Sequence, residues 1–237
     1  EIPLRLVGSE MCIRDSIKKI KKMKIFHTIC AAFMAATIAS CDAHQDFPDT
    51  SMKIGDIVCT DGKIVRYEDM KIQEKTPIAV VFYVNQKEDI EGTGYAVYLK
   101  DIEPCAYSDS IGIKHDTSAD LTALDGNSNT HAMRSTGTSP AAEAVFDIWE
   151  YGQSAYIPSV AQLYLLYDTR NKINEYIRKC GGDEIQDNPD ECWYWTSTEV
   201  KNQETDKAWL FSLASGAIQE TPKTQAHKIR PIITLYN

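Results

Sequence analysis

The side chains of this chain that could perform nucleophilic, metal-binding or redox chemistry are its histidines, serines and cysteines. No metal-ligand spacing is present among the five histidines His27, His44, His115, His131 and His227. A nucleophile-elbow context is missing around Ser135, Ser139 and Ser197. No closely spaced pair, as zinc would require, occurs among Cys59, Cys105, Cys180 and Cys192. We therefore expect no catalytic set, no metal and no cofactor.

A short segment near the amino end has the pattern of a secretory signal. Met23-Lys24-Ile25 is a basic start, and an apolar stretch runs from Ile29 to Ala39. This stretch is shorter than the roughly 20 residues that span a bilayer. Its ending, Ile38-Ala39-Ser40-Cys41, resembles the lipobox of bacterial lipoproteins. The resemblance implies a signal over 23–40, an acylated Cys41 that anchors the chain to a membrane, and an exported domain at the cell surface, on the outer membrane or on the periplasmic face. The alternative is an ordinary cleaved signal with an accidental cysteine.

Residues 1–22 precede this signal and are expected to be non-native. The segment 1–16 resembles translated adapter read-through, and Met23 is the expected start. Removing residues 1–40 takes away seven of the 25 basic and three of the 34 acidic residues, which leaves a formal charge of −13 over 197 residues. Such an acidic chain is unsuited to phosphate backbones, so nucleic acid is not an expected partner.

Export places the remaining cysteines in an oxidising compartment, where an even number predicts disulfides. Cys180 and Cys192 flank a loop rich in Gly, Asp and Pro, and we favour a bridge between them. Cys59–Cys105 then follows by elimination. Spacing alone leaves all three pairings open.

The expected elements form an α+β domain. A polar tether covers 41–52, and a hairpin around Asp61-Gly62 covers 54–65. Mid-chain helices are expected over 141–151 and from 160 to 179, the second capped by Ser159 with Gln162. The remaining expectations are a long loop over 109–140 and strands over 77–84, 94–99, 193–196, 208–213 and 228–235.

Five blocks in a fixed order resemble the Lcl carboxy-terminal domain family of the C-type lectin-like fold. They are Asp125-Gly126-Asn127 with Asn129-Thr130, Pro140 to Glu143, Tyr156 to Ser159 with Gln162-Leu163, Tyr194 to Glu199 with Ala208-Trp209, and Arg230-Pro231. The match covers 120–237, and 53–119 forms an amino-terminal β-rich part. The resemblance implies mid-chain helices packed on antiparallel strands in a surface lipoprotein or adhesin-like module. The calcium motifs of sugar-binding lectins are missing.

The blocks also assign roles to single residues. Trp195 and Trp209 are expected in the core, because indoles contribute large buried areas. We expect Glu199 to be a buried acceptor that orders a turn, and Arg230 to pair with a carboxylate across the fold. In related folds the loops between the late strands form the recognition face, which gives Trp193, Tyr194, Asn202 and Lys207 as candidate ligand contacts.

The function expected from these observations is a lipid-anchored, non-enzymatic module that binds a glycan or a protein partner. One alternative is a formylglycine-generating type of oxidoreductase, which would need Cys180 and Cys192 as a reactive thiol pair. A second alternative is a structural subunit of a surface appendage.

Overall fold

A computed structural model describes residues 50–86, 92–150 and 153–236, and residues 51–237 form one compact unit. The expected read-through, the signal, Cys41 and nearly all of the tether lie outside the described residues. Within the part that is described, no helix has the length and apolarity needed to cross a membrane.

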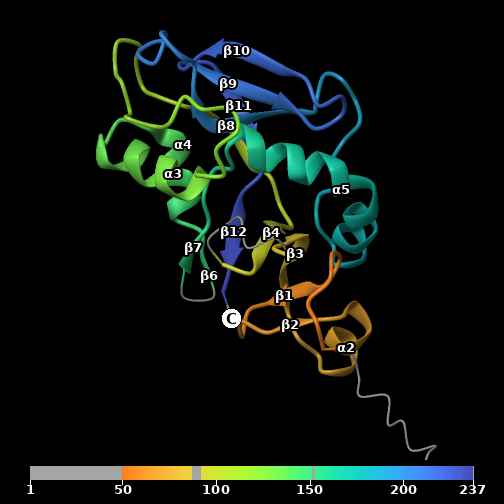
Figure 1. The fold of residues 1–237 in the computed structure, drawn as a ribbon. Coiled ribbons are helices and arrows are strands. Elements are labelled where there is room, and N and C mark those ends of the chain that lie inside the picture. The colour runs from red at the N-terminus through yellow and green to blue at the C-terminus, as the bar shows by residue number, and fades with distance from the viewer. Residues whose placement is uncertain (1–49, 87–91, 151–152, 237) are drawn as a thin grey trace, which may run out of the picture. The chain divides into compact units, whose positions relative to one another are not determined.

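The unit contains twelve named strands and four helices in the described ranges (Figure 1). The helices are α2 (Tyr67–Ile72), α3 (Gly126–Ser135), α4 (Pro140–Phe146) and α5 (Val160–Lys179). The first seven strands are β1 (Ile57–Cys59), β2 (Ile64–Val65), β3 (Pro77–Val84), β4 (Gly94–Tyr98), β5 (Ile102–Ala106), β6 (Trp149–Glu150) and β7 (Gln153–Ser154). The last five are β8 (Trp193–Glu199), β9 (Lys207–Ser212), β10 (Ile218–Pro222), β11 (Ala226–Ile229) and β12 (Ile232–Leu235). The predicted α+β class is confirmed.

The first sheet is antiparallel and has the order β12-β4-β3-β1-β2. The predicted hairpin supplies β1 and β2, and the predicted strand 77–84 is its central strand. Alternate residues of β3 enter different cores: Val80 and Phe82 pack with α5, whereas Ala79 and Val81 pack with residues of α3 and α4. Burial on both faces explains the continuous apolar sequence of this strand.

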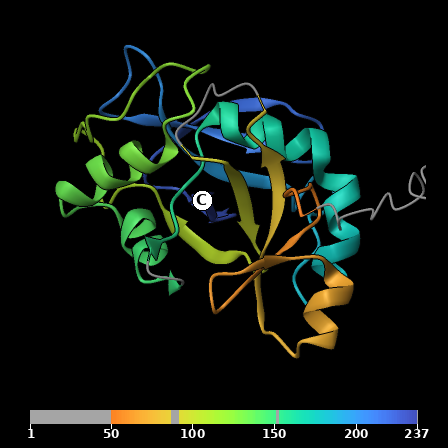
Figure 2. The same ribbon diagram turned by 60° about the horizontal axis from the view of Figure 1, so that its bottom comes forward.

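The second sheet has the order β10-β9-β8-β11-β5, with only its β8–β11 pair parallel. The predicted strand 228–235 is wrong as a single element. It divides at Arg230-Pro231 into β11 of the second sheet and β12 of the first, because proline cannot donate to a ladder. Helix α5 contacts β3 of one sheet and β8 and β9 of the other (Figure 2).

Helices α5 and α3 differ in how clearly the sequence predicts them. Helix α5 starts with the expected capping box, in which Ser159 Oγ accepts from the Gln162 N–H and Gln162 Oε1 accepts from the Ser159 N–H. Helix α3 lies inside the predicted loop 109–140, so that prediction is wrong. Its buried side is largely polar: Thr130 Oγ1 donates to Gly126 O, and Asn129 donates to Asp125. Hydrogen bonds replace the apolar stripe that sequence periodicity detects.

The predicted boundary at 119/120 does not divide the structure. Strand β5 pairs with β11 and β4 pairs with β12, so the two expected parts share both sheets and belong to one compact unit.

Candidate functional site

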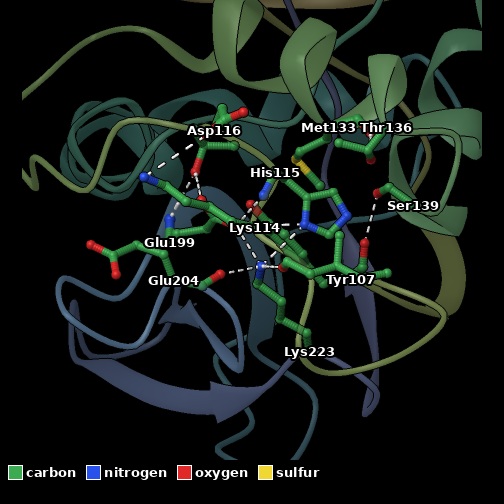
Figure 3. A network of polar contacts seen from close by, with 12 residues as sticks. Tyr107, Lys114, His115, Asp116, Met133, Thr136, Ser139, Glu199, Glu204 and Lys223 are labelled. Atoms are coloured by element: carbon green, nitrogen blue, oxygen red, sulfur yellow. Dashed lines mark hydrogen bonds and ion pairs between the residues drawn. The ribbon is translucent and has the colours of Figure 1, made fainter.

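A fully buried ion pair lies beside the second sheet (Figure 3). Glu199 ends β8, Lys223 directly follows β10, and neither side chain is exposed to solvent. The Lys223 ammonium contacts Glu199 Oε1 and donates to two backbone carbonyls, Ile113 O at 2.9 Å and Glu204 O at 2.5 Å. The lysine is thus surrounded by acceptors from the end of β8 and from two loops, those that contain Ile113 and Glu204.

The loop around His115 completes this network. The His115 N–H donates to Glu199 Oε1 at 2.9 Å, and Thr117 Oγ1 donates to Glu199 Oε2 at 3.0 Å. Lys223 Nζ lies 3.1 Å from His115 Nδ1, while Thr138 Oγ1 lies 3.3 Å from His115 Nε2. The Tyr107 ring packs edge-on against the imidazole. Every side-chain oxygen of Glu199 therefore has a donor, as a buried carboxylate requires.

The electrostatics favour an ionised carboxylate. Burial alone would raise the pKa of Glu199, but hydrogen bonds from His115 and Lys223 outweigh it and bring the pKa down to about 2. Desolvation lowers the pKa of Lys223, and the neighbouring Glu199 carboxylate opposes that change. Burial and the same carboxylate raise the pKa of the Tyr107 hydroxyl well above its usual value. Glu199 and Lys223 thus form a buried pair of opposite charges.

The network joins loops, and the side chains of His115, Glu199 and Lys223 are fully buried in it. Three cavities of about 460, 340 and 300 Å³ in the described part of the chain are lined by other residues. The loops that it fixes are also joined directly, since the Gly112 N–H donates to Thr205 O at 2.8 Å. Glu199 is thus a buried acceptor that links the end of β8 to the loop around His115 and to Lys223.

A second buried ion pair joins the two sheets. Arg230 lies in the link between β11 and β12, and its Nη1 donates to Asp101 Oδ1 at 2.7 Å. Its Nη2 donates to Asp183 O at 2.7 Å, in the loop after α5. Tyr194 Oη donates to the other Asp101 oxygen at 3.2 Å. The partner of Arg230 is a carboxylate across the fold, and the pair is structural.

Trp195 and Trp209 both pack in or against the hydrophobic cores. Trp195 is fully buried, and its Nε1 donates to Cys105 O at 3.0 Å. Trp209 is half-buried and packs against the core around α5.

The four described cysteines are free thiols, so the predicted bridges Cys180–Cys192 and Cys59–Cys105 are absent. Cys59 belongs to the core around α5, whereas Cys105 packs against the other core. The Cys192 thiol lies 3.1 Å from Ser212 Oγ, and Cys180 caps the carboxyl end of α5. The members of each predicted pair thus pack in different surroundings.

The predicted ligand face is corrected by the positions of its residues. Tyr194 is fully buried. Trp193 lies where β8 begins, opposite Ser212, whereas Lys207 lies at the far end of the same strand pair beside Glu220. Only Asn202 is an exposed loop residue, next to the loop that the buried network fixes. The four therefore do not form one surface.

Sequence reasoning did not find the exposed aromatic group at Trp149, whose side chain is 59 % exposed. Its ring centroid lies 6.1 Å from that of Phe146 at the end of α4. The guanidinium carbon of Arg134 lies 3.2 Å from the Phe146 centroid, and Arg134 Nε lies 3.5 Å from a Glu143 oxygen. We call Trp149, Phe146, Arg134 and Glu143 the aromatic patch. Ile148 and Trp149 follow Val145 by three and four residues, a spacing typical of the core side of a helix, so the sequence did not mark Trp149 as exposed.

Among the described residues, no group of three or more His, Cys, Asp and Glu side chains could hold a metal ion. The site geometry thus consists of two buried ion pairs, free thiols and one exposed aromatic patch.

Comparisons with known proteins found one likeness in structure and none in sequence families. No protein-family model matches the chain, and no curated protein does. A solved fimbrial protein from Bacteroides ovatus is similar in structure, with a TM-score of 0.58 and 16 % sequence identity. The similarity covers 76 % of this chain and 48 % of the fimbrial protein, so the chain spans about half of its length. At this identity the likeness describes the fold.

Proposed function

We propose that this chain is an exported, non-catalytic subunit of a bacterial surface appendage, tethered by a lipid on Cys41. The observation that carries the proposal is the likeness to the Bacteroides ovatus fimbrial protein over 76 % of the chain. The signal and lipobox pattern that ends at Cys41 supports export. A C-type lectin-like fold over 120–237 remains part of this proposal through the ordered sequence blocks.

The buried chemistry also supports a structural role. The titratable groups of the Glu199–Lys223 network are saturated by one another and line none of the three cavities. The formylglycine-generating alternative is not favoured, because the thiols of Cys180 and Cys192 lie in different surroundings.

The test is to express the chain from Met23, its expected start, in a fimbriated Bacteroides host with metabolic palmitate labelling. The proposal expects a labelled, surface-exposed protein that enters high-molecular-weight polymers on native gels. Cys41→Ser should abolish labelling and surface retention, whereas the matched control Cys30→Ala, in the same signal segment, should be labelled normally. An unlabelled chain that stays soluble in the cytosol would overturn the proposal.

Recognition of a saccharide is a second candidate function, favoured by the aromatic patch. An exposed indole offers a flat π face to the C–H groups of a sugar ring, and Arg134 and Glu143 beside it can bond hydroxyl groups. A single tryptophan presents at most about 250 Å², far below the roughly 800 Å² that each partner buries in a stable protein interface. The patch therefore fits a small saccharide better than a protein.

Trp149→Ala should weaken saccharide binding about tenfold or more while changing the free energy of unfolding by less than about 0.5 kcal/mol. The measurement is a glycan array followed by titration of its best ligand. Ile72→Ala removes another exposed apolar side chain, 79 % exposed on α2, and should leave binding intact. Equal binding by wild type and Trp149→Ala would exclude the patch as the contact site.

A further inference from the structure

The carboxyl-terminal half of α5 lies against the amino-terminal hairpin. The backbone at Gly55 is so close to the Tyr176 ring that an added Cβ would lie 2.6 Å from Tyr176 Cε2. Farther along the helix, Lys179 Nζ lies 5.3 Å from the centroid of Tyr67, the first residue of α2. These contacts place the last turn of α5 beside the segment that carries β1, β2 and α2.

Cys59 and Cys180 belong to the two segments that this contact joins. Cys59 ends β1, where it is opposite Pro77 of β3. Cys180 caps α5 and lines, together with Pro77 and Ile78, a cavity of about 340 Å³. Both cysteines pack in the same core, Cys59 fully buried and Cys180 half-buried. The cavity gives the Cys180 side an opening toward solvent.

The electrostatics of Cys180 also involve Cys59. Desolvation is the main cause that raises the pKa of Cys180 to about 11, and the neighbouring Cys59 adds to it. Cys105 packs in the other core, and the Cys192 thiol contacts Ser212 and Pro189. Of the pairings that sequence spacing left open, the structure favours the one that joins Cys59 to Cys180.

We propose that Cys59 and Cys180 form a disulfide when the protein meets an oxidising thiol–disulfide partner, linking β1 to the carboxyl end of α5. The oxidant is a disulfide of the glutathione or thiol-oxidoreductase class. A Cys180 thiolate attacks the oxidant to form a mixed disulfide and releases one thiol, and the Cys59 thiolate displaces the second. The protein loses two protons and two electrons, and the oxidant gains them as two thiols.

Such a link would fasten the strand that lies nearest the tether. Strand β1 is three residues long and begins a few residues after the compact unit starts at Ser51. A force applied through a lipid-anchored tether acts first on this strand. A covalent bond to α5 would transmit that force to the hydrophobic core. This consequence rests on the proposed function, but formation of the bond does not.

The test uses the purified full chain, equilibrated in glutathione redox buffer, blocked with N-ethylmaleimide and digested with trypsin and Glu-C. The second protease separates Cys180 from Cys192 by cleaving at Glu184 and Glu191. We expect a peptide of 54–63 linked to one of 180–184, and a mass about 2 Da below the sum of the two thiol peptides. Cys59→Ser and Cys180→Ser should each lose the linked peptide, whereas the controls Cys105→Ser and Cys192→Ser should keep it.

The inference is overturned if Cys59 and Cys180 stay alkylatable in the oxidising buffer, or if either bonds to Cys105 or Cys192 instead. Folding of each variant is checked by its thermal unfolding transition, and the unmodified wild-type chain gives the same answer without any substitution. A linked peptide in vitro together with an unlabelled cytosolic protein in the host would leave the disulfide standing and reject the appendage proposal.

Discussion

Glu199→Gln lowers the free energy of unfolding by about 3–5 kcal/mol, because it leaves the buried Lys223 charge without its counter-charge. The glutamine keeps the size of the side chain, and its carbonyl oxygen can still accept from the His115 N–H, but its amide nitrogen replaces the oxygen that accepts from Thr117. The loss therefore reports the charge together with one changed hydrogen bond, and not the volume. Urea unfolding at pH 7, followed by far-UV circular dichroism, measures it.

Two variants make this result specific. Glu199→Gln combined with Lys223→Met removes both charges, and it should be less destabilised than the sum of the single changes, which gives a favourable coupling in a double-mutant cycle. Glu220→Gln is the matched surface control, since Glu220 pairs with Lys207 at 3.1 Å with both side chains a third or more exposed. It should cost less than about 1 kcal/mol. A Glu199→Gln cost as small as that of Glu220→Gln would contradict the buried pair.

The same pair gives a pH dependence of known sign. The pKa of Glu199 is about 2 in the folded protein and 4.5 as its reference value. A carboxylate with a lowered folded pKa stabilises the fold above the unfolded pKa, and that stability disappears as the pH falls from about 4.5 toward 2. The shift corresponds to about 3 kcal/mol. The wild-type chain should lose that much more stability over this interval than the double variant.

The sequence predicted the Glu199 side of this network but not the Lys223 side. A Tyr-Trp-Thr-Ser-Thr-Glu block indicates a buried acceptor at the end of a strand. Lysine is seldom fully buried, and nothing in the segment Pro222-Lys223-Thr224 differs from an exposed turn. Lys223 is buried because the end of β8 and two loops pack together around it. No local sequence pattern predicts such packing.

The helices and strands also divide into those that local sequence patterns predict and those that depend on tertiary pairing. Strand β3 and the capping box of α5 follow from local patterns, and both occur at their predicted positions. Strands β5 and β10 carry the short patterns Ile-Glu-Pro-Cys-Ala and Ile-Gln-Glu-Thr-Pro, with half-exposed faces that resemble loops. They are the two edge strands of the second sheet and form because the inner strands β11 and β9 supply their partners, which is a tertiary effect.

The Arg230 pair makes the second large prediction. Arg230→Met should lower the free energy of unfolding by about 3–5 kcal/mol, since it leaves the Asp101 carboxylate, 12 % exposed, without its main counter-charge. Arg230→Lys should recover little of this loss. One ammonium cannot reproduce the planar guanidinium fork that reaches Asp101 on one nitrogen and Asp183 O on the other.

Lys228→Met is the matched control for this pair. Lys228 Nζ also lies near Asp101, at 3.8 Å, but its side chain is 34 % exposed, so its removal should cost less than about 1 kcal/mol. Hydrogen exchange then locates the effect. The Asp183 N–H donates to Leu99 O at 2.7 Å, and its protection should fall in Arg230→Met because that substitution frees the loop after α5. If unfolding and exchange were the same in both variants, the link between the two sheets would not depend on Arg230.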